Sequence, residues 1–227
     1  MCEKDPIKLI EVFNSWQGEG PDSGKAMIIL RFKTCNLNCS WCDTRVKMRI
    51  TPEAEYPLAQ LQEIINETGS GILVTGGEPT MAKHYNDCLK LLNYLEYPIA
   101  NVESNGCQLV ELVENVKKNK KVNYIFSPKI FHLSDAEIAE EKALELFNRF
   151  PGKIYLKIVY ENNNMHLKMF MERICNLKNK IPGQFVYLMP EGTTRATLIQ
   201  NSEKVFDAAE KYRFNFSSRD HIIYGFV

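Results

Sequence analysis

The sequence predicts an α/β fold with a mostly parallel sheet, in the form of a reduced or partial (β/α) barrel. Two observations predict it: runs rich in β-branched and aromatic residues alternate with helical periodicities, and several of these runs end in turn residues. Such alternation is typical of a parallel sheet covered by helices. Because ligands of these folds bind at the carboxyl ends of the strands, we expect the functional motifs to follow strands.

The expected strands are short apolar runs, and the expected helices lie between them. The strands cover residues 9–13, 27–32, 72–75, 99–103, 124–126, 154–159 and 185–189. Helical periodicity covers residues 58–65, 109–116, 139–147 and 167–177. Pro57 suits the first turn of the helix that follows it. Ser134 with Glu137 predicts a capping box at the start of the third helix.

Composition indicates an ordinary globular protein. The 227 residues suit one sizeable domain over residues 1–227. The 28 Lys and Arg residues balance the 28 Asp and Glu residues, which gives no electrostatic case for binding nucleic acid or an anionic membrane. The apolar runs fall far short of the ~18 residues of a membrane span, and the N-terminus leads into no signal-peptide core. We therefore expect a cytoplasmic protein with no nucleic-acid and no membrane partner.

Three of the seven cysteines form a Cx3Cx2C loop after the strand at residues 27–32: Cys35, Cys39 and Cys42. Three thiolates at this spacing can ligate three irons of a cubic iron–sulfur cluster and leave the fourth iron open. Structural zinc is the alternative. It normally needs four protein ligands, so the fourth thiolate would come from Cys88 or Cys107.

A glycine pair follows the strand at residues 72–75, in the sequence Thr75-Gly76-Gly77-Glu78-Pro79. Paired glycines allow a backbone to approach a ligand closely, where a Cβ atom would block it. The alternative is a strand-to-helix turn that binds no ligand.

The cysteine loop and the glycine pair together resemble the signature motifs of the radical S-adenosylmethionine (SAM) superfamily. In that superfamily the open iron of a [4Fe–4S] cluster is chelated by the methionine moiety of SAM, and an electron from the cluster breaks the sulfonium bond. The resemblance implies that Cys35, Cys39 and Cys42 hold the cluster. It also implies that Gly77 contacts SAM and that Trp41 lies beside the adenine, although Trp41 also suits a packed loop aromatic.

Further motifs resemble one family of that superfamily, the 7-carboxy-7-deazaguanine synthases of the pathway to queuosine, a tRNA modification. These motifs are Trp16-Gln17-Gly18-Glu19-Gly20, Cys42-Asp43-Thr44, Val102-Glu103-Ser104-Asn105-Gly106 and Ser127-Pro128-Lys129. The resemblance covers nearly the whole chain and implies a single radical SAM domain. It implies a carbon–nitrogen lyase that converts 6-carboxy-5,6,7,8-tetrahydropterin to 7-carboxy-7-deazaguanine with loss of ammonia, using SAM, a [4Fe–4S] cluster and Mg²⁺.

The same resemblance assigns ligands to individual residues. It places the pterin substrate at Trp16, Gln17, Gly18, Arg31 and Thr75, SAM at Gly77, Ser127, Pro128 and Lys129, and Mg²⁺ at Thr44. The planar guanidinium of Arg31 suits a carboxylate, and a hydroxyl oxygen suits Mg²⁺. The alternatives are a solvated strand arginine, an ordinary Ser-Pro-Lys turn, and a threonine that closes a turn on its own backbone.

Two carboxyl-terminal segments complete the implied site. The residues that end the last predicted strand correspond to a segment that contacts SAM in the family: Met189, Pro190, Glu191 and Gly192. The alternative there is a strand-to-helix loop. His221 and Val227 correspond to a histidine and a terminal carboxylate that reach the substrate in the family, although a lone histidine is more often structural. The family often has glutamine where this chain has Arg219.

The resemblance also implies a small-molecule pterin substrate, an external electron donor such as a flavodoxin, and a homodimer. Four cysteines are expected not to be ligands: Cys2, Cys88, Cys107 and Cys175. Two other functions stay open. Another small radical SAM enzyme, such as a glycyl-radical activase, would share the cysteine loop, and a non-enzymatic iron–sulfur or zinc module would need no pterin.

Overall fold

The computed structural model describes residues 6–161 and 163–226, and the chain falls into two compact units. The first unit comprises Met1–Trp16 and Lys25–Tyr124, and the second comprises Gln17–Gly24 and Ile125–Val227. Strand β7 (Val122–Phe126) spans the division between them. The expectation of a single domain over residues 1–227 stays a prediction.

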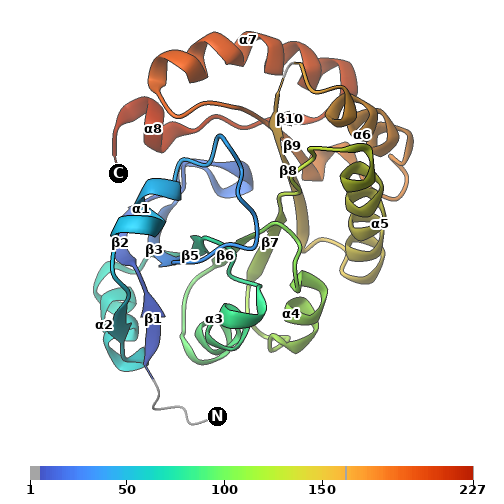
Figure 1. Cartoon of the computed structure of the whole chain (residues 1–227). Helices are drawn as coiled ribbons and strands as arrows, with labels where there is room; N and C mark the ends of the chain where they lie inside the picture. The colour runs from blue at the N-terminus through green and yellow to red at the C-terminus, as the bar shows by residue number, and fades with distance from the viewer. Residues whose placement is uncertain (1–5, 162, 227) are drawn as a thin grey trace. The chain divides into compact units, whose positions relative to one another are not determined.

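The first unit alternates strands with helices, which Figure 1 labels in chain order. Its strands are β1 (Ile7–Leu9), β2 (Glu11–Trp16), β3 (Ala26–Phe32), β4 (Ala54–Tyr56), β5 (Gly71–Gly76) and β6 (Ala100–Ser104). Its helices are α1 (Arg45–Ile50), α2 (Leu58–Thr68), α3 (Ala82–Tyr94) and α4 (Leu109–Asn115).

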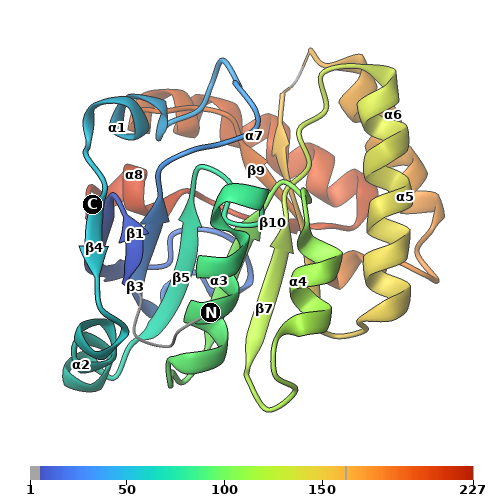
Figure 2. The same ribbon diagram turned by 60° about the horizontal axis from the view of Figure 1, so that its bottom comes forward.

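The larger sheet of the first unit is parallel except at its β2 edge. β3 pairs in parallel with β5, and β5 pairs in parallel with β6, whereas β2 is antiparallel to β3. β1 and β4 form a separate antiparallel pair, which Figure 2 shows beside β3. Glu11 of β2 lies opposite Arg31 of β3, and Arg31 lies opposite Thr75 of β5. These three side chains therefore share one face of the sheet, at the carboxyl ends of β3 and β5.

The second unit holds parallel strands with helices packed against them. Its further strands are β8 (Ile154–Tyr160), β9 (Val186–Pro190) and β10 (Asn215–Phe216), and its helices are α5 (Leu133–Arg149), α6 (Met165–Asn176), α7 (Arg195–Tyr212) and α8 (Asp220–Tyr224). β9 pairs in parallel with both β8 and β10. α5 packs against β8 and α6, and α7 packs against β9 and β10, as Figure 1 shows.

The buried strand β8 carries a lysine in its centre. Leu156 and Ile158 are fully buried, as expected of a parallel strand covered on both faces, and Lys157 between them is buried as well. A buried ammonium group is costly unless an anion pairs with it. The fold around β8 must therefore supply that anion.

The structure confirms a strand at every predicted run after the first. The prediction of one strand over residues 9–13 is wrong, because Ile10 separates β1 and β2, which pair with different strands. Helices α1, α3, α7 and α8 and strands β4 and β10 have no predicted counterpart. In α3 the buried face includes His84 and Lys90, and these polar residues interrupt the apolar periodicity.

The predicted capping box of Ser134 with Glu137 is also wrong. α5 begins at Leu133 with His132 as its N-cap, so the helix already includes both residues. The carboxylate of Asp135 accepts from the backbone nitrogens of Phe131 at 2.9 Å and His132 at 2.8 Å. The actual capping box is thus His132 with Asp135.

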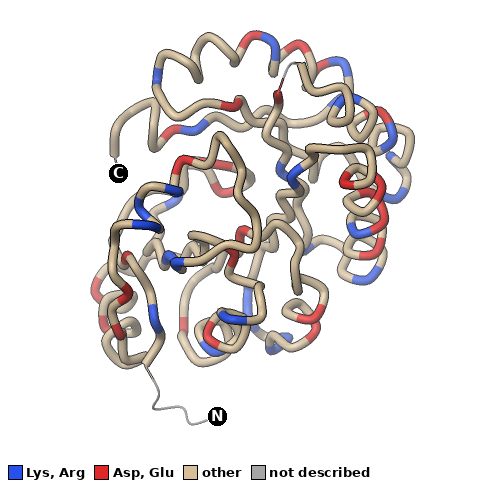
Figure 3. The backbone as a smooth tube through the Cα atoms, in the orientation of Figure 1, with Lys and Arg blue, Asp and Glu red and all other residues tan. Residues whose placement is uncertain are grey.

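Charged residues of both signs are interspersed on the helices, as Figure 3 shows for α5 and α7. Some form exposed ion pairs, such as Arg149 with Glu145 at 2.8 Å. Among the described residues, no helix combines the length and the apolar character needed to cross a membrane.

Asp135→Ala is expected to lower the free energy of unfolding by about 1 kcal/mol, because it removes the acceptor for two backbone N–H groups at the start of α5. Ser134→Ala, at the exposed neighbouring position, is the control and should change it by less than about 0.5 kcal/mol. Chemical denaturation of both variants measures the difference. Equal losses in the two variants would contradict the cap.

Candidate active site

The three motif cysteines lie in one loop, which follows β3 and leads into α1. Cys42 N donates to Cys39 O at 3.3 Å, and Leu37 N donates to the Cys35 sulfur at 3.4 Å. Burial raises the pKa of the Cys35 thiol, and the negative charges of Glu78, Cys39 and Cys42 raise it further. The thiols are therefore close enough to repel one another as thiolates, and bound iron ions would relieve that repulsion. This donor set fits three irons of a [4Fe–4S] cluster.

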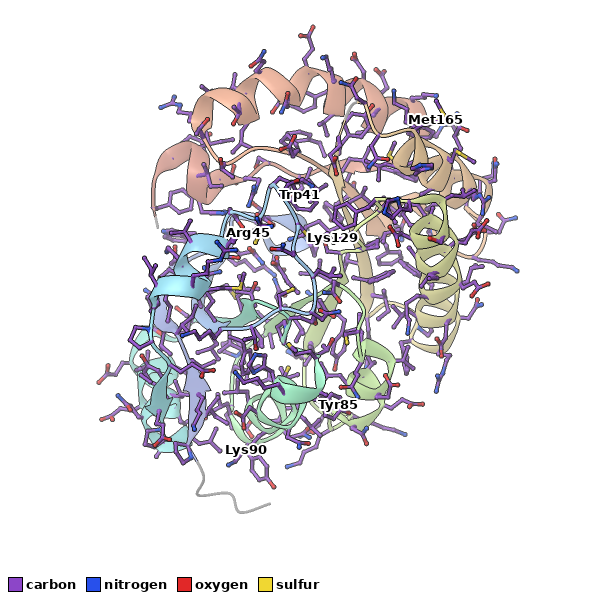
Figure 4. The ribbon with its side chains drawn as sticks, in the orientation of Figure 1. Trp41, Arg45, Tyr85, Lys90, Lys129 and Met165 are labelled. Carbon is purple, nitrogen blue, oxygen red and sulfur yellow. The ribbon has the colours of Figure 1, made fainter. Side chains whose placement is uncertain are left out.

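Arg45 closes this loop from the α1 end. Its guanidinium donates to the Asn38 carbonyl at 2.8 Å and to the Cys39 carbonyl. Figure 4 shows Arg45 and Trp41 in this part of the chain. Because one planar guanidinium binds two neighbouring carbonyls, the backbone around the second motif cysteine is held in one shape.

The glycine pair meets the backbone that leads into the cysteine loop. Gly77 N donates to Phe32 O at 3.0 Å, and Glu78 N donates to Thr34 O at 2.8 Å. A Cβ atom on Gly77 would collide with the Thr34 carbonyl. Gly77 is therefore required by the fold itself, beside the residue that precedes Cys35.

His84 of α3 fixes the same threonine. The Nε2 atom of His84 accepts from Thr34 N at 3.3 Å. Burial, together with the charge of Lys83, lowers the pKa of His84 to about 4. The imidazole is therefore neutral near pH 7 and can act as this acceptor.

Glu78 is a fully buried carboxylate that uncharged donors satisfy. Its Oε1 accepts from Thr80 N at 2.9 Å, Thr80 Oγ1 at 2.6 Å and Ser104 Oγ at 2.8 Å, and its Oε2 accepts from Asn105 N at 2.6 Å. A buried carboxylate without such partners would be costly. These bonds join the turn after β5 to the end of β6.

Asn105 extends this connection to the cysteine loop. Its Nδ2 donates to Asn36 Oδ1 at 2.8 Å and lies 3.9 Å from the Cys35 sulfur. The sequence assigned no role to Glu78 or Asn105, although both stand in motifs that indicated the family. A sequence feature that could have indicated their role is that Glu78 and Asn105 each follow the end of a strand, and these strands, β5 and β6, are neighbours in the sheet.

Arg31 lies in a row of polar side chains and not on a solvated surface. Its side chain is 11% exposed, and its Nε donates to Glu11 Oε2 at 2.6 Å. The other oxygen of Glu11 lies 3.1 Å from Lys47 Nζ. Beside Arg31, the Thr75 hydroxyl donates to Glu103 Oε2 at 3.4 Å. The structure thus brings Arg31 and Thr75 together and adds two acidic residues, Glu11 of β2 and Glu103 of β6.

Thr44 is the N-cap residue of α1, but its hydroxyl does not cap the helix. Its carbonyl accepts from Met48 N at 2.9 Å, whereas its Oγ1 lies 3.4 Å from the Cys42 sulfur. The hydroxyl therefore lies on the cysteine loop and does not bond to its own helix. Trp16, at the end of β2, is 52% exposed and so can contact a ligand.

In the second unit, the Ser-Pro-Lys motif follows β7 and closes on itself. Lys129 Nζ donates to both Ser127 O and Ser127 Oγ at 2.8 Å, so the lysine side chain reaches back past Pro128 to Ser127. The segment predicted to contact SAM is split by the end of β9. Met189 and Pro190 belong to the strand, and the two residues after it, Glu191 and Gly192, begin the loop to α7.

Gln17, Gly18 and His221 lie close together in the second unit. Gln17 is buried, and its Nε2 has no hydrogen-bond partner among the described residues. Because an unpaired buried donor is costly, a ligand atom is a suitable acceptor for it. A Cβ atom on Gly18 would collide with the ring and backbone nitrogen of His221. Glycine therefore allows the carboxyl-terminal segment to pack against this turn.

Glu19 is buried between two cations. Its Oε1 accepts from Arg219 Nε at 2.9 Å, and its Oε2 accepts from Lys157 Nζ. Burial alone would raise the pKa of Glu19, but the charges of Lys157, Arg219 and His221 hold this pKa well below its usual range. Glu19 is therefore ionised near pH 7, and it is the anion that the buried lysine of β8 requires.

Comparison with known proteins decides the family. Residues 29–134 match the radical SAM superfamily. The chain is 29% identical to the 7-carboxy-7-deazaguanine synthase of Hyperthermus butylicus over 225 residues, 96% of this chain and 92% of the relative. It is 31% identical to the synthase of Thermoplasma acidophilum over 163 residues, 68% of this chain and 70% of the relative. The chain belongs to the 7-carboxy-7-deazaguanine synthase family.

Solved structures agree with this family in fold. The crystal structure of QueE from Escherichia coli matches with a TM-score of 0.59 at 18% identity, over 93% of each chain. Streptococcus suis SuiB bound to the precursor peptide SuiA matches with a TM-score of 0.52 at 17% identity, over 84% of this chain and 47% of that chain. At such identities these matches show the fold alone. The predicted α/β fold of the radical SAM type, with its mostly parallel sheet, is confirmed.

Membership of the 7-carboxy-7-deazaguanine synthase family also decides between the functions that the sequence left open. The chain is a radical SAM enzyme, whose cofactors are a [4Fe–4S] cluster, SAM and Mg²⁺. The comparisons favour this function over a glycyl-radical activase and over a non-enzymatic metal module. The roles of individual residues stay predictions.

The remaining cysteines have different surroundings. Cys88 is fully buried in α3, and burial raises the pKa of its thiol far above the usual range, which suits a residue that is not a ligand. Cys107 is exposed, and Cys175 is partly buried. Cys2 and Val227 lie outside the described residues, so the predictions for them stay predictions.

Proposed function

We propose that this chain catalyses the conversion of 6-carboxy-5,6,7,8-tetrahydropterin to 7-carboxy-7-deazaguanine with release of ammonia. One observation carries the proposal: Arg31 and Thr75 lie side by side at the carboxyl ends of paired strands, and one of these strands leads into the three-cysteine loop. The guanidinium of Arg31, which suits a carboxylate, and the loop proposed to bind the cluster thus lie at the end of the same strand. The reaction balances, because the product and ammonia together contain every atom of the pterin.

In this proposal Cys35, Cys39 and Cys42 hold the cluster, and Gly77 and Trp41 contact SAM. When bound, the cluster would supply the electron for cleavage of SAM, and SAM would supply the radical chemistry directed at C6 of the pterin. Residues of the second unit also contact SAM in this proposal: Ser127, Pro128, Lys129, Met189, Pro190, Glu191 and Gly192. The ammonium group of Lys129 is the charge suited to the carboxylate of SAM.

Arg31 binds the carboxylate of the pterin. Glu11 holds the Nε edge of the guanidinium, so the orientation of its plane is fixed before the substrate arrives. Because Lys47 also pairs with Glu11, the three residues together keep a net positive charge for the substrate. Thr75 and Trp16 contact the pterin beside Arg31.

The other proposed ligands are on the cysteine loop and in the second unit. Thr44 supplies its hydroxyl oxygen to Mg²⁺. The other oxygen ligands of the cation come from water or from the substrate. Gln17, Gly18, His221 and Val227 contact the pterin. The buried Nε2 of Gln17, which has no partner among the described residues, donates to an acceptor of the substrate.

The physiological setting belongs to the same proposal. An external one-electron donor such as a flavodoxin reduces the cluster, the enzyme acts in the cytoplasm as a homodimer, and its product enters the pathway to queuosine.

Anaerobic turnover tests this function. The reconstituted chain is incubated with the carboxylated tetrahydropterin, SAM, Mg²⁺ and a reductant, and the products are identified by mass spectrometry. We expect 7-carboxy-7-deazaguanine and ammonia in equal amounts. Cleavage of SAM with an unchanged pterin would instead indicate another radical SAM enzyme. A protein that binds no iron would exclude both the synthase and any other radical SAM activity.

Arg31→Lys is expected to weaken binding of the pterin, because a lysine ammonium cannot reproduce the planar fork. Losing one charge-assisted hydrogen bond costs about 1.5–3 kcal/mol, so the dissociation constant should rise roughly 10- to 150-fold. Arg49→Lys, at an exposed position of α1, is the matched control. Titration of the pterin into each variant measures the change. An Arg31→Lys variant with the affinity of the wild type would exclude Arg31 as the carboxylate ligand.

Thr44→Val is expected to abolish the stimulation of turnover by Mg²⁺ while the iron content stays unchanged. The substitution removes the hydroxyl oxygen but preserves the shape of the side chain, and Mg²⁺ requires oxygen ligands. Turnover rates with and without Mg²⁺ are compared for this variant, the wild type and the control Thr51→Val at the end of α1. If Thr44→Val keeps the stimulation of the wild type, the hydroxyl is not a ligand.

A further inference from the structure

We propose that Arg219 is a positioning residue, which clamps the carboxyl-terminal segment and its His221 against the turn formed by Gln17–Gly20. The side chain of Arg219 is 8% exposed and binds two partners distant in sequence. Its Nε donates to Glu19 Oε1 at 2.9 Å, and its Nη1 donates to the Gly192 carbonyl at 2.6 Å. One guanidinium thus joins three separate segments of the second unit.

The geometry requires an arginine. A guanidinium presents donors along two edges of one plane, so it can reach a carboxylate and a carbonyl at the same time. A glutamine at this position would offer one uncharged amide group instead of the guanidinium, so it could not neutralise the charge of Glu19. The clamp is therefore a property of this chain, in which arginine occupies the position.

Backbone contacts show what the clamp holds. Asp220 N donates to Gly18 O at 3.0 Å, and Gly20 N donates to Ser217 Oγ at 2.8 Å. Ser23 Oγ donates to Asp220 Oδ2 at 2.9 Å. Arg219 lies between the two carboxyl-terminal residues that make these bonds, so its anchoring restrains both.

His221 depends on the same clamp. Its Nε2 lies 3.8 Å from the oxygen of Glu19 that accepts from Arg219, and its ring lies against Gly18. Glu19 is thus oriented by Arg219 and is itself close to His221. Without Arg219, the Glu19 carboxylate keeps Lys157 but loses the partner of the oxygen that faces His221, so the histidine is less restrained.

The second unit should still fold without the clamp. Lys157 binds the other oxygen of Glu19, so Arg219→Gln leaves the buried carboxylate paired with one cation. The remaining pair of Glu19 and Lys157 has no net charge, so the variant leaves no buried charge without a partner of opposite sign. The variant therefore separates the positioning role from a loss of the fold.

Hydrogen exchange of the full chain, measured without substrate, is the first test. In Arg219→Gln we expect the amides of Gly20 and Asp220 to exchange roughly tenfold faster or more, because local opening of the segment becomes easier. The β8 amides of Leu156 and Ile158 should keep wild-type rates. Arg219→Lys, which preserves the charge but reaches only one partner, should give intermediate rates, and the exposed Arg195→Gln should give wild-type rates. Unchanged exchange at Gly20 and Asp220 would overturn the clamp.

Steady-state kinetics is the second test, and this part rests on the proposed function. In Arg219→Gln we expect the KM for the pterin to rise about tenfold with a much smaller change in kcat, with the iron content unchanged and partial recovery in Arg219→Lys. Faster exchange with an unchanged KM would overturn the positioning role. Exchange needs no pterin, so it still decides the clamp if the chain fails to turn over this substrate.

Discussion

The close approach of Gly77 to Thr34 is the constraint on which the first unit depends. Two backbone hydrogen bonds, Gly77 N to Phe32 O and Glu78 N to Thr34 O, continue the pairing of β3 and β5 beyond the strands. Only a residue without a Cβ atom fits there. Because the cysteine loop begins at the next residue after Thr34, its starting direction is set by the glycine pair and not by the loop itself.

The two units stabilise a buried carboxylate in different ways. Glu78 is satisfied by neutral donors from Thr80, Ser104 and Asn105, and these bonds join the ends of β5 and β6. Glu19 is paired with Lys157 and Arg219, and it joins β8 to the carboxyl-terminal segment. In both units the carboxylate stands in a family motif, and its bonds hold the backbone beside residues proposed to bind cofactor or substrate.

The parts of the site that could be predicted from the sequence are those marked by motifs of residues close together in the chain. The spacing of the cysteines, the glycine pair and the alternation of strands with helices were sufficient for the family and the fold. Contacts distant in sequence could not be predicted: Arg219 reaches Glu19 across 200 positions, and its burial is invisible in the pattern around it. The helix cap at His132 was missed because a histidine is an unusual cap and a Ser with a Glu three residues later stood two residues away. The break at Ile10 was missed because residues 9–13 are mostly apolar on both sides of it, and the division into β1 and β2 depends on the different strands with which they pair.

The most direct test of this account is the iron content of Gly77→Ala, measured after anaerobic reconstitution together with the thermal stability of the apoprotein. The added methyl group collides with the Thr34 carbonyl, so we predict a destabilised apoprotein that binds far fewer than the about four irons expected of the wild type. Gly152→Ala is the control for destabilisation alone: its methyl group would meet no atom within 4 Å, but its positive φ of 76° strains any side chain, so it should lose stability and still bind iron like the wild type. Full iron content and wild-type stability in Gly77→Ala would contradict the claim that this approach sets the cysteine loop.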